Sequence, residues 1–137
     1  MKLWLLDTGP LVAYLDRDQP EHIRTIRGLG EFSGQLCTTS AVITEAMYFV
    51  RGVPDGPGIL AEFIEVTRTL VYDYTQPVRL KSAAALMEKY SDTPMDFADA
   101  TLVLLAGELK ITEIATFDRR GFLTYRTVGG KPFRLAL

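Results

Sequence analysis

Carboxylates that lack a basic partner are the residues of this sequence best suited to chemistry. Glu45 lies in the apolar stretch AVITEAMYFV, where no Lys or Arg is three or four residues away to pair with it along a helix. Asp99 lies in MDFADATLVLLAGEL, again without a basic residue at those spacings. Burying an unpaired carboxylate costs free energy, so each needs a partner from elsewhere in the fold or a metal ion. We therefore interpret Glu45 and Asp99 as functional residues.

Two further aspartates follow apolar runs that are typical of strands. Asp7 comes directly after LWLL, and Asp118 comes directly after EIATF. Both would lie beyond the carboxyl ends of strands, where open α/β sheets place their functional crevice. Asp is also favoured at turns and helix caps for backbone reasons alone, so these two positions allow either role.

Asp96 has a structural alternative to a direct role in chemistry. With Thr93 as the cap and Pro94 as the first helical residue, Asp96 is expected at the third helical position. A carboxylate there meets the positive amino end of the helix. We therefore expect Asp96 to cap the helix or to support Asp99.

Four carboxylates at one place repel each other, on the order of 4 kcal/mol per pair at about 4 Å with an effective dielectric of about 20. A cation makes such an arrangement stable. The chain has a single His and a single Cys, so oxygen ligands dominate, and these favour Mg²⁺ or Mn²⁺. Such a site can activate water and stabilise the leaving oxygen of a phosphodiester.

The elements that position these residues alternate along the chain. Apolar runs predict strands at 2–6, 35–41, 69–74 and 113–118, with one or two edge strands in 121–137 around the turn at Gly129 and Gly130. Helical patterns cover 10–18, 21–32, 41–52, 59–67, 77–90 and 95–110. This alternation predicts an α/β fold, with a mostly parallel central sheet covered by helices on both faces.

Length and composition limit the classes of protein to consider. The 137 residues suffice for one domain, residues 1–137, and the 47% hydrophobic and 23% charged residues are usual for a globular chain. The net charge of −2 lacks the basic signature of many nucleic-acid binders. No apolar run reaches the roughly 18 residues of a membrane span, and the start lacks a signal-peptide pattern, so we expect a cytoplasmic protein with no membrane contact.

The ordered set LLDTGPLVAYL, TTSAVITEAMYFV and DFADATLVLLAGELKITEIATFDRRGF resembles the PIN-domain ribonucleases, in particular the VapC-like toxins of bacterial type II toxin–antitoxin pairs. The resemblance covers nearly the whole chain. It implies a three-layer α/β/α sandwich and a Mg²⁺- or Mn²⁺-dependent endoribonuclease that hydrolyses RNA. It also implies a homodimer and a cognate antitoxin whose tail covers the acidic groove.

The family's acidic cluster falls on Asp7, Glu45, Asp99 and Asp118. The resemblance implies that Asp7, Asp99 and Asp118 bind the metal, while Glu45 completes the cluster or acts through a water. Further candidates are the supporting residues Thr8, Asp96 and Thr116 and the RNA-phosphate contacts Arg119 and Arg120, with Arg24, Arg27, Arg126, Lys131 and Arg134 as possible members of a basic rim. Ordinary strand-end threonines and solvated arginines would give the same pattern.

One position departs from many relatives. They carry a further acid three residues beyond the strand-end aspartate, where this chain has Gly121. The second metal position is therefore in question, and Asp96, which shares a helix face with Asp99, is a candidate to compensate. Tyr48, Phe49 and the Gly/Pro loop 52–58 fit either a contact surface or a packed core.

Two other functions share part of this pattern. Magnesium phosphatases with a nucleophilic Asp after the first strand need a second Asp two residues later, where this chain has Gly9. A PIN-like domain that binds RNA or protein without cleavage would be expected to lack at least one of the four acids. All four acids are present here, which favours the nuclease.

Overall fold

The computed structural model describes residues 1–137, which form one five-stranded sheet flanked by helices. All strands are parallel, in the order β3-β2-β1-β4-β5. Their bounds are Leu3–Leu6 (β1), Gln35–Thr39 (β2), Leu70–Tyr72 (β3), Glu113–Ala115 (β4) and Arg134–Leu135 (β5). The predicted sheet is confirmed, and it is entirely rather than mostly parallel.

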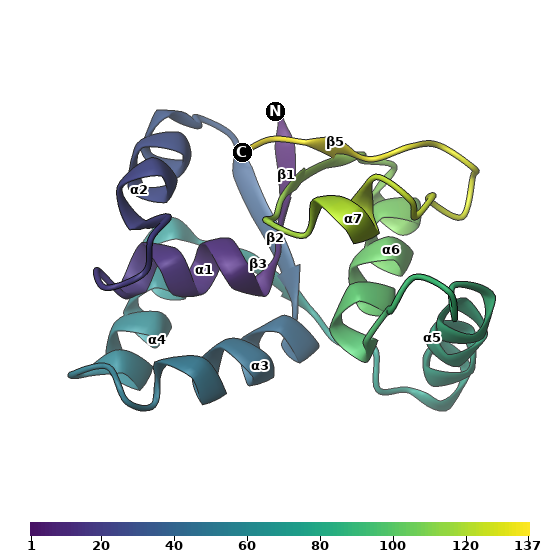
Figure 1. Ribbon diagram of the computed structural model, residues 1–137, viewed down its shortest axis with the longest axis horizontal. Coiled ribbons are helices and arrows are strands. Elements are labelled where there is room, and N and C mark those ends of the chain that lie inside the picture. The colour runs from purple at the N-terminus through teal and green to yellow at the C-terminus, as the bar shows by residue number, and fades with distance from the viewer.

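Helices cover both faces of this sheet. Their bounds are Thr8–Leu15 (α1), His22–Glu31 (α2), Ser40–Val50 (α3), Gly56–Thr67 (α4), Pro77–Lys89 (α5), Phe97–Leu109 (α6) and Arg119–Phe122 (α7). Helices α1 to α4 lie on one side of the sheet and α5 to α7 on the other (Figure 1). The predicted three-layer α/β/α sandwich is therefore confirmed. None of the helices combines the length and the apolar character that a membrane crossing requires.

The core lies around the central strands and the inner helix α6. Leu5 and Leu6 of β1 and Ile114 of β4 have no exposed surface. Helix α6 is buried on most sides, with Leu102 and Leu105 fully enclosed. Because its Ala and Leu residues favour helix and carry no polar groups, α6 can be sandwiched between the sheet and α5. Its amino end emerges from this core beside the ends of the strands.

Several helices begin elsewhere than the sequence predicted, and two of these differences affect acidic residues. Helix α1 begins at Thr8 with Asp7 as its cap, because Pro10 is tolerated throughout the first turn, where backbone N–H groups lack partners anyway. Helix α6 begins at Phe97 with Asp96 as its cap, so the predicted cap at Thr93 is wrong. Asp99 and not Asp96 therefore occupies the third helical position.

The end of the chain also differs in detail. The short helix α7 was not predicted, since four residues give no periodic pattern. The turn at Gly129 and Gly130 connects Arg126 and Pro132, which pair in an isolated antiparallel bridge. The only regular strand in this segment is β5, which pairs parallel with β4.

Candidate active site

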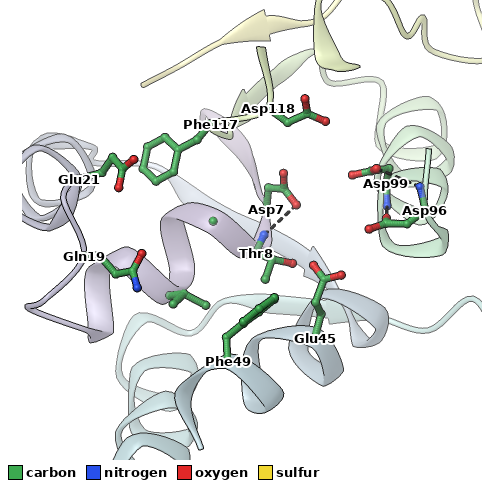
Figure 2. A pocket seen from close by; sticks show the side chains of 12 residues that line it. Asp7, Thr8, Gln19, Glu21, Glu45, Phe49, Asp96, Asp99, Phe117 and Asp118 are labelled. Carbon is green, nitrogen blue, oxygen red and sulfur yellow. Dashed lines mark hydrogen bonds between the residues drawn. The ribbon is translucent and has the colours of Figure 1, made fainter. Parts of the chain in front are cut away.

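A pocket of about 520 Å³ opens at the carboxyl ends of β1 and β4. Figure 2 shows acidic side chains reaching it from several elements: Asp7 after β1, Glu45 on α3, Asp96 and Asp99 at the start of α6, and Asp118 after β4. No Lys, Arg or His lines this pocket. The tertiary structure thus brings all five acids of interest to one cavity without a basic partner.

Asp7 is the most enclosed of these acids, with 7% of its surface exposed. As the cap of α1 it accepts a hydrogen bond from the Thr8 amide at 2.8 Å, and it accepts another from the Thr116 hydroxyl at 2.7 Å. Burial nevertheless raises the pKa of Asp7 to about 6, with a further contribution from the charges of Asp96 and Glu45. The capping role that the sequence allowed for Asp7 is therefore confirmed, and its functional role stays a prediction.

Thr116 joins the ends of the two central strands. Its hydroxyl donates to Asp7 and also accepts the Asp118 backbone N–H at 3.0 Å. Asp118 in turn caps α7 by accepting the Gly121 amide at 2.9 Å. These contacts fix the two strand-end carboxylates relative to each other.

Asp96 and Asp99 form a reciprocal capping box. Asp96 accepts the Asp99 amide at 2.8 Å, and the Asp99 carboxylate accepts the Asp96 amide at 3.1 Å. Burial raises the pKa of Asp99 to about 8, and the neighbouring charges of Asp96 and then Asp7 add to that effect. The hydrogen bond to the Asp96 amide opposes the shift without cancelling it. No basic side chain compensates the ionised form of Asp99, so without a cation the folded protein favours its protonated form.

A hydrogen bond between α3 and α6, which the sequence did not indicate, places Glu45 near Asp99. Thr39, the cap of α3, lies 2.8 Å from the Thr101 hydroxyl of α6. Because Thr101 already donates to the Ala98 carbonyl, its oxygen accepts the Thr39 hydroxyl hydrogen. Both threonines are fully buried. This hydrogen bond ties the amino ends of α3 and α6 together and so positions Glu45 beside the Asp96–Asp99 pair.

The pocket contains the types of side chain that bind a divalent metal ion, but the acids do not converge on one point. No three Asp, Glu, His or Cys side chains are arranged as ligands of a common ion. Each predicted ligand, Asp7, Asp99 or Asp118, instead accepts a hydrogen bond from a backbone amide with one of its oxygens. Carboxylate oxygens keep further lone pairs, and the Thr8 hydroxyl is buried without a hydrogen-bond partner in the same pocket. These oxygen donors fit a hard divalent cation.

The predicted basic residues take different positions. Arg119 and Arg120 are exposed at the start of α7, directly after Asp118. Arg24 lies over the ring of Phe117, a pocket-lining residue, at 4.9 Å from its centroid. Arg126 is committed to backbone carbonyls of its own turn. Lys131 lines a separate cavity, whereas Arg24 contacts the pocket-lining Phe117 and Arg119 follows the pocket-lining Asp118 in the chain.

Several residues of the pocket were absent from the sequence-based set. Gln19, Glu21 and Phe117 line it, as does Gly9. Gln19 and Glu21 lie in the connection between α1 and α2, whose position beside the pocket depends on tertiary packing. Nothing in the local sequence indicated this position.

Three comparisons with known proteins agree with this architecture. The family model described as the PIN domain matches residues 4–127. The chain belongs to the PIN-domain family. The resemblance seen in the sequence is thereby confirmed.

Among characterised PIN-domain proteins, this chain is similar to Ribonuclease VapC26 of Mycobacterium tuberculosis strain ATCC 25618 / H37Rv. The two are 30% identical over 132 residues, which cover 94% of this chain and 96% of the relative. The crystal structure of Mycobacterium tuberculosis VapC20, described as a toxin that cleaves the sarcin-ricin loop, superposes with a TM-score of 0.78 at 17% identity. That match covers 93% of this chain and 98% of VapC20 and shows a shared PIN fold.

The departure at Gly121 has a local explanation in this PIN domain. A Cβ atom at that position would lie 2.3 Å from Oδ2 of Asp118 and 2.9 Å from Cε2 of Tyr125. Tyr125 is fully buried and donates to the Pro94 carbonyl at 2.6 Å, so it has little freedom to move. With this arrangement of Asp118 and Tyr125, a side chain at position 121 does not fit.

Proposed function

We propose that this PIN domain is a Mg²⁺- or Mn²⁺-dependent endoribonuclease and the toxin of a toxin–antitoxin pair, acting in the cytoplasm. The observation that carries the proposal is the pocket itself, where Asp7, Glu45, Asp99 and Asp118 meet without any basic side chain. The similarity to Ribonuclease VapC26 over nearly the full chain supports the same activity. The uncompensated acids give that activity a physical basis.

Asp7, Asp99 and Asp118 would hold the divalent ion, with the Thr8 hydroxyl as a further oxygen donor. When bound, the ion would supply charge stabilisation at the phosphate and activation of a water molecule. The support for these ligands is electrostatic, because burial and mutual repulsion raise the pKa values of Asp7 and Asp99 where no cation is present. Asp96 stabilises the start of α6 and keeps the Asp99 carboxylate facing the pocket.

Glu45 is suited to hold and deprotonate the attacking water. It is half-buried, reaches the pocket from α3 on the side opposite Asp118 (Figure 2), and has no hydrogen-bond or ion-pair partner in the protein. Thr116 has a positioning role, since it orients Asp7 through its hydroxyl.

RNA phosphates adjacent to the cleaved bond would meet the cations at the pocket rim. Arg119 and Arg120 follow Asp118 and are exposed, and Arg24 is held over Phe117. Phosphate contacts of this kind position a nucleic acid without reading its sequence. They would also offset the repulsion between the acids and the RNA backbone.

A cognate antitoxin is the second proposed partner. A pocket of this acidity is complementary to a peptide tail that places a Lys or Arg among the carboxylates, which would neutralise them in place of a metal ion. The resemblance also implies a homodimer, and we include that assembly in the proposal.

The decisive experiment is cleavage of a structured RNA pool by the purified protein with Mn²⁺, with Mg²⁺ and with chelator, beside Asp99→Asn prepared in the same way. We expect cleavage that requires the metal and disappears in the variant. Asn keeps an oxygen that can accept the Asp96 amide, so the capping box and the fold should survive the substitution.

A lack of cleavage by the folded protein, freed of any bound inhibitor, in every metal condition would contradict the nuclease. That result would favour the alternative of a PIN-like module that binds RNA or protein without catalysis. Metal-independent cleavage that persists in Asp99→Asn would point to a contaminating ribonuclease.

A further inference from the structure

The pocket extends beyond the cluster of candidate metal ligands, and this extension is lined by aromatic and polar side chains. Gln19, Glu21 and Phe117 line one side, and Phe49 of α3 lines another (Figure 2). The cavity of about 520 Å³ is larger than one hydrated ion requires. The extension is therefore available to a group attached to the phosphate that the acids and their metal ion would hold.

Phe49 gives this extension an aromatic surface. It is 55% exposed although it is among the largest apolar side chains of the protein. It follows Glu45 by four residues on α3, so the two side chains share a helix face and lie about 6 Å apart at their Cβ atoms. Tyr48 packs edge-on against its ring at 5.5 Å between centroids. An exposed ring beside a phosphate-processing site is suited to stack on an unpaired nucleobase.

Gln19 and Glu21 add polar groups at the other side of the extension. The Gln19 amide nitrogen donates to Asp16 at 3.2 Å, and because a carboxylate only accepts, this contact leaves the Gln19 carbonyl oxygen free. Glu21 precedes α2 but makes no capping hydrogen bond and no ion pair. Both residues therefore present free hydrogen-bond acceptors to the cavity.

We propose that this extension binds a guanine base of the RNA substrate, next to the phosphate being cleaved. Guanine presents two adjacent donors on its Watson–Crick edge, N1–H and the N2 amino group, which match the two oxygens of a carboxylate. Glu21 accepts both, Gln19 adds a further acceptor, and the base stacks on Phe49. The other bases lack this donor pair. The inference rests on the proposed function, because the acidic half of the pocket must hold the attached phosphate.

The test is calorimetric titration of the protein, in the presence of Mg²⁺, with guanosine monophosphate, inosine monophosphate and adenosine monophosphate. Inosine lacks only the N2 amino group, so its binding should be about tenfold weaker than that of guanosine. Phe49→Leu should weaken binding of all three nucleotides about tenfold and keep their ratios, since stacking does not depend on base identity. Glu21→Gln should remove the preference for guanosine over inosine.

Matched variants separate these effects from loss of folding. Phe49→Tyr keeps the aromatic face and should bind all three nucleotides as the wild type does. Glu31→Gln changes an exposed acid of the same helix α2 that does not line the pocket, and it should leave the preference intact. Equal melting temperatures of all variants would exclude unfolding as the cause.

The subsite and the nuclease can fail independently. If the protein cleaves RNA but binds the three nucleotides equally, and Phe49→Leu and Glu21→Gln change nothing, the guanine subsite is wrong and the nuclease stands. If the predicted nucleotide preferences are found but no RNA is cleaved, the subsite stands and the proposed catalysis is wrong.

Discussion

The Thr116 hydroxyl lies 2.7 Å from Oδ2 of Asp7 and donates a hydrogen bond to it across the boundary between β4 and β1. The same oxygen accepts a hydrogen bond from the Asp118 backbone amide, so one threonine contacts both strand-end acids. Thr116 is 1% exposed, so its hydroxyl is shielded from bulk solvent. The relative position of two candidate metal ligands therefore depends on a residue that is not itself a candidate ligand.

Thr116→Val should loosen this arrangement. It removes the hydrogen bond to Asp7 and leaves the Asp118 amide without its acceptor, so we expect a loss of about 1–2 kcal/mol in the free energy of unfolding. The pKa of Asp7 should rise further, because the lost hydrogen bond favours its ionised form. Urea denaturation and the pH dependence of stability measure the two effects. Thr124→Val, which removes an exposed hydroxyl bonded to a carbonyl, is the control.

The metal-free protein should become less stable as pH rises from about 4 to about 8. Asp7 and Asp99 have folded-state pKa values of about 6 and about 8, above the value of 3.8 for a free Asp. Between these limits the folded state binds more protons than the unfolded state, so stability is full at the acidic end and is lost as pH rises through the folded pKa values.

Asp7→Asn should flatten this profile, because the neutral amide has no charge to bury. At pH 8 with chelator we expect the variant to gain on the order of 2 kcal/mol relative to the wild type, and at pH 4 little or no gain. Thermal melts at both pH values measure the difference. A wild-type stability that rises with pH across this range would contradict the electrostatic account of the pocket.

Mn²⁺ should stabilise the wild type but not Asp99→Asn. An ion that binds only the folded state contributes about 2.7 kcal/mol at a concentration about one hundred times its dissociation constant. The variant loses a charged ligand yet keeps an oxygen for the capping box, so its metal-free stability should equal or exceed that of the wild type. Differential scanning calorimetry with and without Mn²⁺ measures both quantities.

Asp92→Asn provides the control for nonspecific cation effects, because Asp92 is exposed and does not line the pocket. It should retain the full stabilisation by Mn²⁺. Equal melting shifts in the wild type and Asp99→Asn would show that the ion binds elsewhere.

Gly121→Ala should displace Asp118. The added Cβ would lie 2.3 Å from Oδ2 of Asp118 and 2.9 Å from the Tyr125 ring, so the chain must shift at a cost of about 1–3 kcal/mol. We expect lower stability and weaker Mn²⁺ binding by calorimetric titration.

Gly30→Ala is the matched control for that substitution. Gly30 lies in α2, and a Cβ there would meet no atom within 4 Å. Alanine should stabilise this variant slightly, because it restricts the unfolded chain and favours helix. If Gly121→Ala behaves like Gly30→Ala, the close packing around Asp118 is not a constraint on the site.

The sequence by itself determined the alternation of strands and helices, because hydrophobic periodicity and helix signals are local. It also pointed to Glu45 and Asp99, because no Lys or Arg lies three or four residues away from them. It pointed to Asp7 and Asp118, because open α/β sheets place functional crevices beyond the carboxyl ends of their strands. These inferences need only residues within one turn or one strand. The same locality explains two wrong helix boundaries. Pro10 fits several positions of a first turn, and Pro94 precedes the cap of α6 instead of beginning the helix.

The tertiary structure alone decided which groups face each other. The bond between Thr39 and Thr101 joins residues 62 positions apart, and that between Asp7 and Thr116 joins residues 109 apart. No local pattern specifies such pairs, because their contact depends on the packing of whole elements. The same is true of Gln19 and Glu21, which line the pocket because of how the connection from α1 to α2 packs in the folded chain. The elevated pKa values of Asp7 and Asp99 have the same origin, because burial and facing charges exist only in the folded chain.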